Sequence, residues 1–171
     1  MNGYDAAAWT GFFTAITGAA AALAGLLFVA VSINLEHILK APPQGTTMLP
    51  ARAAETLAIL VFVLMSAALA LVPQNLRLLG AEILVIVVPQ AVITVRNQLR
   101  YRRQNPNAPL LWSVSRMTAS GVGLFPGLLA GISLAAHWGG GLYWVAPLCL
   151  IGIVSAVFSA WVLLAEIVTR P

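Results

Sequence analysis

Charge is the scarcest property of this sequence. Asp, Glu, Lys and Arg together make up 8% of its 171 residues, whereas a soluble domain carries about 25%. So few charges cannot cover a water-facing surface of this size, and we therefore expect a lipid bilayer to be the solvent for most of the chain. The hydrophobic content of 60% and the mean hydropathy of +0.92 agree with this expectation.

Cysteine pairs and the common enzyme motifs are also absent. Cys149 is the only cysteine, so the chain cannot form an internal disulfide. No HExxH, Walker or GxSxG pattern occurs. His37 and His137 are expected on opposite faces of the membrane, and Ser133 shares one helix with His137, where a catalytic pair is not expected. We therefore predict a non-enzymatic protein with no cofactor and no metal.

Five unbroken apolar runs predict an all-α integral membrane bundle of five transmembrane helices, in one domain over residues 1–171. They cover about 9–35, 53–72, 78–95, 111–136 and 142–168. A helix of about 20 residues crosses a hydrocarbon core of roughly 30 Å, whereas an open sheet would leave backbone groups unpaired in lipid. The first run lacks a positively charged lead and is too long for a signal peptide, so we expect it to be retained.

The basic residues predict an orientation for these five runs. Eight of the nine basic residues fall on one side of the five-span layout: Lys40, Arg52, Arg96, Arg100, Arg102, Arg103, Arg116 and Arg170. Only Arg77 falls on the other side. Because basic loops stay in the cytoplasm, the C-terminus is predicted inside and the N-terminus outside. Aromatic residues favour the membrane interfaces, and the outer one is expected to hold Trp9, Trp138, Tyr143 and Trp144.

The stretch 96–103 is predicted to be a basic loop at the inner membrane face. Its arginines flank apolar runs and do not form a free basic arm, which argues against nucleic acid as the partner. We expect the loop to contact anionic lipid headgroups, with docking of a partner protein as the alternative.

Small residues recur on one face of two predicted helices. Gly11, Gly18 and Gly25 follow one another at intervals of seven residues, and Ser32 continues the series. A second series, at intervals of four residues, contains Gly123, Gly127 and Gly131. Small residues let helix backbones approach closely in lipid. Both series are candidate helix-packing faces, either inside one bundle or between copies of the protein.

Polar residues inside the runs are candidates for a functional path. Glu82 and Gln90 lie eight residues apart on roughly one helix face, and Pro89 frees a backbone carbonyl between them. With Asn34, they could line a hydrated path, because a polar group inside a membrane suggests function. The alternative is that Gln90 bonds a neighbouring helix while Glu82 pairs with Arg77 or reaches the headgroups. Two further pairs are expected to be ordinary ion pairs at the inner interface: Arg52 with Glu55, and Glu166 with Arg170.

Several stretches together carry a resemblance to a known group of proteins: Gly11–Phe13, Ala21–Leu35, Leu49–Leu57, Leu71–Gln74 and Gly80–Glu82. The chain resembles small bacterial multi-pass inner-membrane proteins, mainly from actinobacteria and proteobacteria, some of which are labelled modulators of the FtsH protease. The resemblance covers about half of the chain. It implies a bacterial inner-membrane location and a multi-pass topology, and it implies no catalytic residues.

Two functions remain open from the sequence. The first is a non-enzymatic membrane protein that acts by packing its helices against copies of itself or against a larger membrane complex. The alternative is a small homo-oligomeric ion channel or transporter with its path near Glu82 and Gln90.

Overall fold

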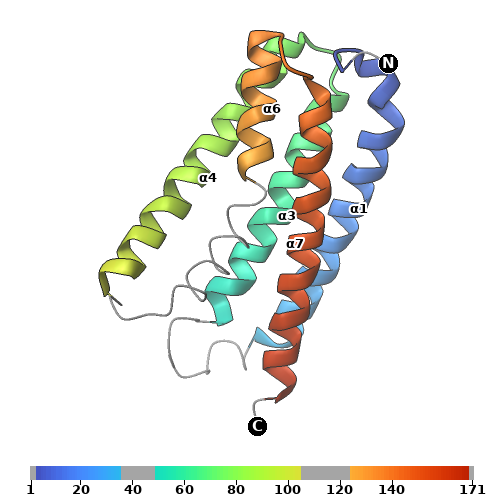
Figure 1. The fold of residues 1–171 in the computed structure, drawn as a ribbon. Coiled ribbons are helices and arrows are strands. Elements are labelled where there is room, and N and C mark those ends of the chain that lie inside the picture. Colours follow the sequence, from blue (N-terminus) through green and yellow to red (C-terminus); the bar gives the residue numbers. More distant parts are fainter. Residues whose placement is uncertain (1–2, 36–48, 105–123, 170–171) are drawn as a thin grey trace.

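The computed structural model describes residues 3–35, 49–104 and 124–169, and the regular structure in these ranges is helical throughout (Figure 1). The helices are α1 (Ala6–Ile33), α3 (Leu49–Leu71), α4 (Leu76–Gln104), α6 (Leu124–Ala136) and α7 (Leu142–Thr169). The all-α prediction is therefore confirmed for this part of the chain. Successive helices run in opposite directions, so α1 begins and α7 ends at opposite ends of the bundle. We call the end that holds Gly3, Pro73 and Gly140 the upper end.

Three of the helical segments are long and apolar enough to cross a membrane: Ala6–Ile33, Ala53–Leu71 and Leu142–Val162. Leu124–Ala136 is apolar but shorter. At about 1.5 Å per residue, the 28 residues of α1 reach roughly 40 Å, which exceeds the thickness of a hydrocarbon core. The count of five spans stays a prediction, because α4 is not among these segments and residues 105–123 lie outside the described ranges.

The ends of two helices differ from the sequence prediction. α4 continues to Gln104, so the stretch 96–103 is helical and the predicted loop is wrong. This stretch contains no glycine or proline, and arginine, glutamine and leucine all favour helix. The arginines of this stretch are therefore consistent with a membrane boundary, but they do not end the helix. α3 begins at Leu49 and not at residue 53, which is possible because proline is tolerated in a first helical turn, as at Pro50.

Turn chemistry ends the helices at the upper end. α3 stops at Leu71, two residues before Pro73, and the Asn75 side chain accepts a hydrogen bond of 3.0 Å from the Arg77 backbone N–H as α4 begins. Between α6 and α7, His137 and three successive glycines, 139–141, all have positive φ. Glycine adopts such angles at little cost, so these residues allow a tight turn.

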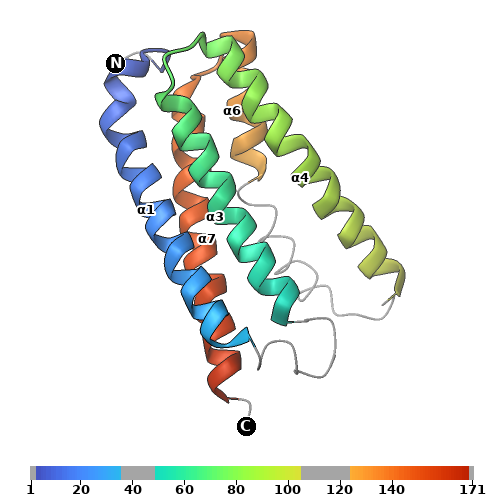
Figure 2. The same ribbon diagram turned by 180° about the vertical axis from the view of Figure 1, so that it is seen from behind.

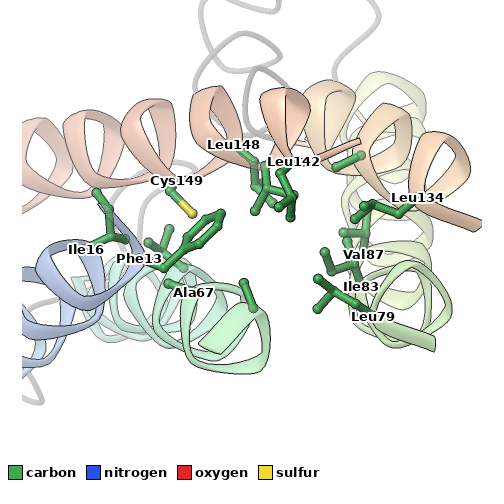
Figure 3. Close-up of a cluster of buried hydrophobic side chains, with 14 of the residues drawn as sticks. Phe13, Ile16, Ala67, Leu79, Ile83, Val87, Leu134, Leu142, Leu148 and Cys149 are labelled. Carbon is green, nitrogen blue, oxygen red and sulfur yellow. The ribbon is translucent and has the colours of Figure 1, made fainter. Parts of the chain in front are cut away.

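The larger of two buried clusters lies where the upper halves of the helices meet (Figure 3), and a smaller one, of Leu27, Ala53, Leu60 and Ala156, joins the other halves of α1, α3 and α7. Phe13 of α1, Ala67 of α3 and Cys149 of α7 pack in one part of the larger cluster. Leu79, Ile83 and Val87 of α4 face Leu134 of α6 in another, with Leu142 and Leu148 of α7 in between. α7 thereby connects the two parts of the bundle.

The helices form two closely packed pairs, α1 with α3 and α4 with α6, and α7 contacts both pairs. α4 makes few contacts with α3. In both views α4 leans away from α3 toward its C-terminal end (Figures 1 and 2). The basic end of α4 consequently lies to the side of the other described helices.

Candidate functional site

The most connected polar structure in the described residues is at the upper end, where Gly3 and Tyr4 lie across the α6–α7 turn. We call these two residues the N-terminal strap. The carbonyl of Gly3 accepts a hydrogen bond of 2.8 Å from the backbone N–H of Leu142, and the Tyr4 hydroxyl accepts one of 3.2 Å from Gly140. The Tyr4 ring also stacks on His137, with ring centroids 4.3 Å apart. The strap therefore joins the start of the chain to a turn far along the sequence, which no local pattern predicted.

Ser133 holds the α6–α7 turn from the inside. Its hydroxyl donates a hydrogen bond of 2.5 Å to the carbonyl of Trp138 and accepts one of 2.8 Å from the backbone N–H of Gly141. The side chain is buried. Because both of its hydrogen-bonding roles are used on backbone groups, Ser133 is a structural residue of this turn. His137 is engaged with Tyr4 and has no hydrogen bond to Ser133 among the described contacts.

We expect Ser133→Ala to lower the free energy of unfolding by about 1–3 kcal/mol, because the buried N–H of Gly141 loses its acceptor. Thr10→Val is a matched control, since the exposed Thr10 hydroxyl bonds only the carbonyl of Ala6 in its own helix. Unfolding in detergent, followed by tryptophan fluorescence, measures both variants. Equal stability of Ser133→Ala and the original protein would contradict the assigned role of this hydroxyl.

Aromatic side chains gather around the upper end of the described helices. Trp9 packs edge-on against Tyr143 with centroids 5.0 Å apart, and it also contacts Phe12 and Phe13. The Trp144 indole N–H donates a hydrogen bond of 2.8 Å to the carbonyl of Gly139, which again ties α7 to its own turn. Trp138 is 81% exposed. Four aromatic residues from α1, the turn and α7 thus lie at one level of the molecule.

The partner of Glu82 in the structure is Gln74, whereas the sequence suggested Arg77. Its carboxylate accepts a hydrogen bond of 2.7 Å from the side-chain amide of Gln74, which also donates to the carbonyl of Leu69 at 3.2 Å. Arg77 forms no ion pair with Glu82 in the described part of the chain, where the Gln74 amide is the partner of the carboxylate. The Gln74 amide thereby connects the end of α3 to the first turns of α4, and Glu82 takes part in holding this turn.

The three residues of the candidate polar path are not brought together. Asn34 lies at the opposite end of the bundle from Glu82, where its side-chain amide donates a hydrogen bond of 2.9 Å to the carbonyl of Ala30. Gln90 is half-buried about two helical turns below Glu82, and no described residue hydrogen-bonds to it. Pro89 is exposed on the outside of α4. No continuous polar path through these residues is visible in the described part of the chain.

The predicted ion pairs fall mostly outside the described side chains. The side chains of Arg52 and Glu166 and the whole of Arg170 are not described. Glu55 is exposed near the start of α3 and has an interaction partner. Within the described ranges, no group of three or more His, Cys, Asp or Glu residues could hold a metal ion.

The two glycine series have different surroundings. A Cβ at Gly131 would lie 2.5 Å from Cγ of Leu84, and one at Gly127 would lie 3.0 Å from a methyl of Val87, so both glycines sit where α6 packs on α4. Gly123 lies outside the described residues. By contrast, a Cβ at Gly11, Gly18 or Gly25 would meet nothing within 4 Å. The α1 series therefore does not pack against a described helix of the same chain.

Gly80, which belongs to neither glycine series, is buried opposite Gly131. A Cβ at Gly80 would lie 2.6 Å from the backbone nitrogen of Ala135 and 2.8 Å from the carbonyl oxygen of Gly131. Among the glycines described, Gly80 is where the backbones of α4 and α6 approach each other most closely. A lone glycine in an apolar run gives no periodic signal, so only the partner helix identifies its role.

No known protein family model matches this chain, and neither the curated proteins nor the solved structures compared with it yield a match.

Proposed function

We propose that this protein is a non-enzymatic, five-span membrane protein that acts by self-association through the outward face of α1. The observation that carries the proposal is the open space around Gly11, Gly18 and Gly25, which contrasts with the close packing of Gly127 and Gly131. Seven-residue spacing places the three open glycines along one narrow face. In lipid, faces of this kind support close helix–helix contact.

The contrast between α1 and the other exposed surfaces supports this assignment. Much of the exposed surface along the first two-thirds of α1 comes from small residues, including Ala15, Ala19 and Ala22, whereas the large side chains Phe13 and Ile16 point inward. The exposed surface of α7 instead contains large apolar residues: Leu150, Val154, Val157, Phe158 and Trp161. A lipid-facing surface has no need for small residues, but a close contact between two helices does.

The proposed topology has five spans, with the N-terminus outside and the C-terminus in the cytoplasm of a bacterium. The alternating directions of the described helices and the eight-to-one distribution of basic residues support it. In this arrangement the upper end faces outward. Tags on the two termini, probed in intact cells, test the topology, since five spans require them to be on opposite sides.

The test of self-association is Gly18→Leu, which fills the open face with a large side chain. Because nothing lies within 4 Å of this position, the substitution should leave the fold of one chain intact. We expect the original protein to run as an oligomer in light scattering coupled to size exclusion, and Gly18→Leu to shift it at least tenfold toward the monomer.

Ala81→Leu provides the matched control, because Ala81 is exposed on α4 and the substitution places the same leucine side chain on another helix. We expect this variant to keep the oligomer. A monomeric original protein, or an equal shift in both variants, would argue against self-association through α1. If the purified chain is monomeric and crosslinking in cells recovers the same second protein each time, the α1 face packs against a larger membrane complex instead of a second copy.

The channel or transporter alternative receives less support. Glu82 is engaged with Gln74, and Asn34 lies at the other end of the bundle. Ion flux into liposomes that falls on Glu82→Gln would revive this alternative.

A further inference from the structure

The C-terminal part of α4 combines three features that occur together in neither α1 nor α7. It is rich in arginine, it carries exposed apolar side chains, and it leans away from the other described helices. From this combination we infer that residues 92–103 bind the phosphate headgroups of anionic phospholipids at the membrane surface. The inference rests on the membrane-spanning part of the proposed function, but not on self-association.

Helical geometry arranges the arginines of this segment on the edges of an apolar stripe. Positions 96, 100 and 103 follow one another at intervals of four and three residues, so they share one face of the helix. Val92, Val95 and Leu99 form the neighbouring stripe and are 49%, 56% and 54% exposed. Position 102 falls on the other side of that stripe, beside the row that contains Val95. An apolar stripe with basic residues on both edges is the arrangement of a helix at a lipid interface.

The charge of this segment is not neutralised along the chain. No acidic residue occurs between Glu82 and Glu166, although five arginines do. Glu82 itself belongs to the other end of α4, where it bonds Gln74. Arg96 is exposed and forms no ion pair with any residue in the described ranges. An exposed guanidinium without a carboxylate partner, such as that of Arg96, is free to bind an external anion, and phosphate matches the planar, multi-donor geometry of arginine.

The apolar stripe favours a phospholipid over a soluble anion as the ligand of residues 92–103. The exposed side chains of Val92, Val95 and Leu99 lie on the same helical turns as exposed Arg96, and positions 100 and 103 follow within about two further turns. A phospholipid supplies an acyl chain for the stripe and a phosphate for the arginines, whose long apolar stems can reach the headgroup level. A soluble polyanion would leave the stripe exposed to water. The surface therefore fits anionic phospholipid better than nucleic acid or free phosphate.

The test compares lipid binding by the full-length protein and two variants in nanodiscs of phosphatidylcholine and phosphatidylglycerol. Native mass spectrometry counts the lipids of each class that stay bound. The first variant combines Arg96→Gln, Arg100→Gln and Arg103→Gln, which keeps good helix formers at all three positions. The second is Arg77→Gln, which removes an exposed arginine from the opposite end of the same helix.

We expect the original protein to retain phosphatidylglycerol in preference to phosphatidylcholine. Each arginine near an anionic surface contributes about fivefold to binding, so the triple variant should lose most of this preference and Arg77→Gln should keep it. High salt should weaken the preference of the original protein. Circular dichroism of the triple variant should show unchanged helix content.

Three results would overturn the inference: an unchanged preference in the triple variant, an equal loss in Arg77→Gln, or tight binding of inorganic phosphate or an RNA oligonucleotide to the original protein in detergent. The nanodisc bilayer has the same composition on both faces, so an error in the proposed orientation does not affect the outcome. Gly18→Leu should keep its lipid preference, which separates a failure of this inference from a failure of self-association.

Discussion

Replacing Gly80 with alanine is expected to lower the free energy of unfolding by about 3 kcal/mol. The added methyl group would lie 2.6 Å from the backbone nitrogen of Ala135 and 2.8 Å from the carbonyl oxygen of Gly131. Both obstacles are backbone atoms of α6, so no side-chain rotation relieves the overlap. α4 and α6 would have to separate, and the contacts of Leu79 and Ile83 with Leu134 would loosen with them.

Gly25→Ala is the control for this prediction. Gly25 lies in the middle of α1, and a methyl group added there would meet nothing within 4 Å. Alanine favours helix over glycine by up to about 1 kcal/mol, so the fold of a single chain of this variant should be unchanged or slightly more stable. Unfolding of both variants in mixed micelles, followed by helix content, measures the difference. Comparable stabilities would show that α4 and α6 are not packed through Gly80.

Gly141→Ala is expected to release the N-terminal strap and to cost about 2–3 kcal/mol. The φ angle of Gly141 is +54°, which costs a residue with a side chain about 1–2 kcal/mol. In addition, a Cβ here would lie 2.6 Å from the carbonyl oxygen of Gly3 and 2.6 Å from the Tyr4 ring. The strap would therefore have to move off the turn. Hydrogen exchange at the Leu142 amide reports this directly, because that amide donates to Gly3.

Gly139→Ala separates the backbone effect from the steric effect. Gly139 also has a positive φ, of +86°, but a Cβ there would come no closer than 3.6 Å to the Ser133 hydroxyl. This variant should be destabilised only by the unfavourable φ angle of its backbone, and the Leu142 amide should stay protected from exchange. If Gly139→Ala speeds exchange at Leu142 as much as Gly141→Ala does, the strap is not held by contact with Gly141.

The glycines illustrate how far sequence periodicity can lead. The spacing of Gly11, Gly18 and Gly25 predicts that they lie on one helix face, because helix periodicity is a local property, and all three lie within α1. The same spacing did not reveal that this face is open, while the face of Gly127 and Gly131 is covered by α4. Gly80, which belongs to no series, makes a closer approach than any of the α1 glycines. Which helix covers which face depends on the packing of the whole bundle.

For the polar residues too, the sequence indicates which side chains are unusual, but only the packed structure shows their partners. The sequence singled out Glu82 because a carboxylate inside an apolar run is unusual, but its partner Gln74 is bound through the shape of the α3–α4 turn. The strap could not be predicted from Gly3 and Tyr4 either, since its contacts lie with Gly140, Gly141 and Leu142. These contacts join residues separated by 136 positions in the sequence, as for Tyr4 and Gly140, and they form only once the helices between them have packed.

The sequence by itself determined the helical class and its apolar character, because both follow from composition and from local backbone preferences that act over a few residues. Only the tertiary structure decided which small residues are buried, where the basic end of α4 lies, and how the N-terminal strap is held. These features arise from side chains that meet across large sequence separations. The physical reason is that close packing and hydrogen bonding depend on distances in space, which local patterns do not encode.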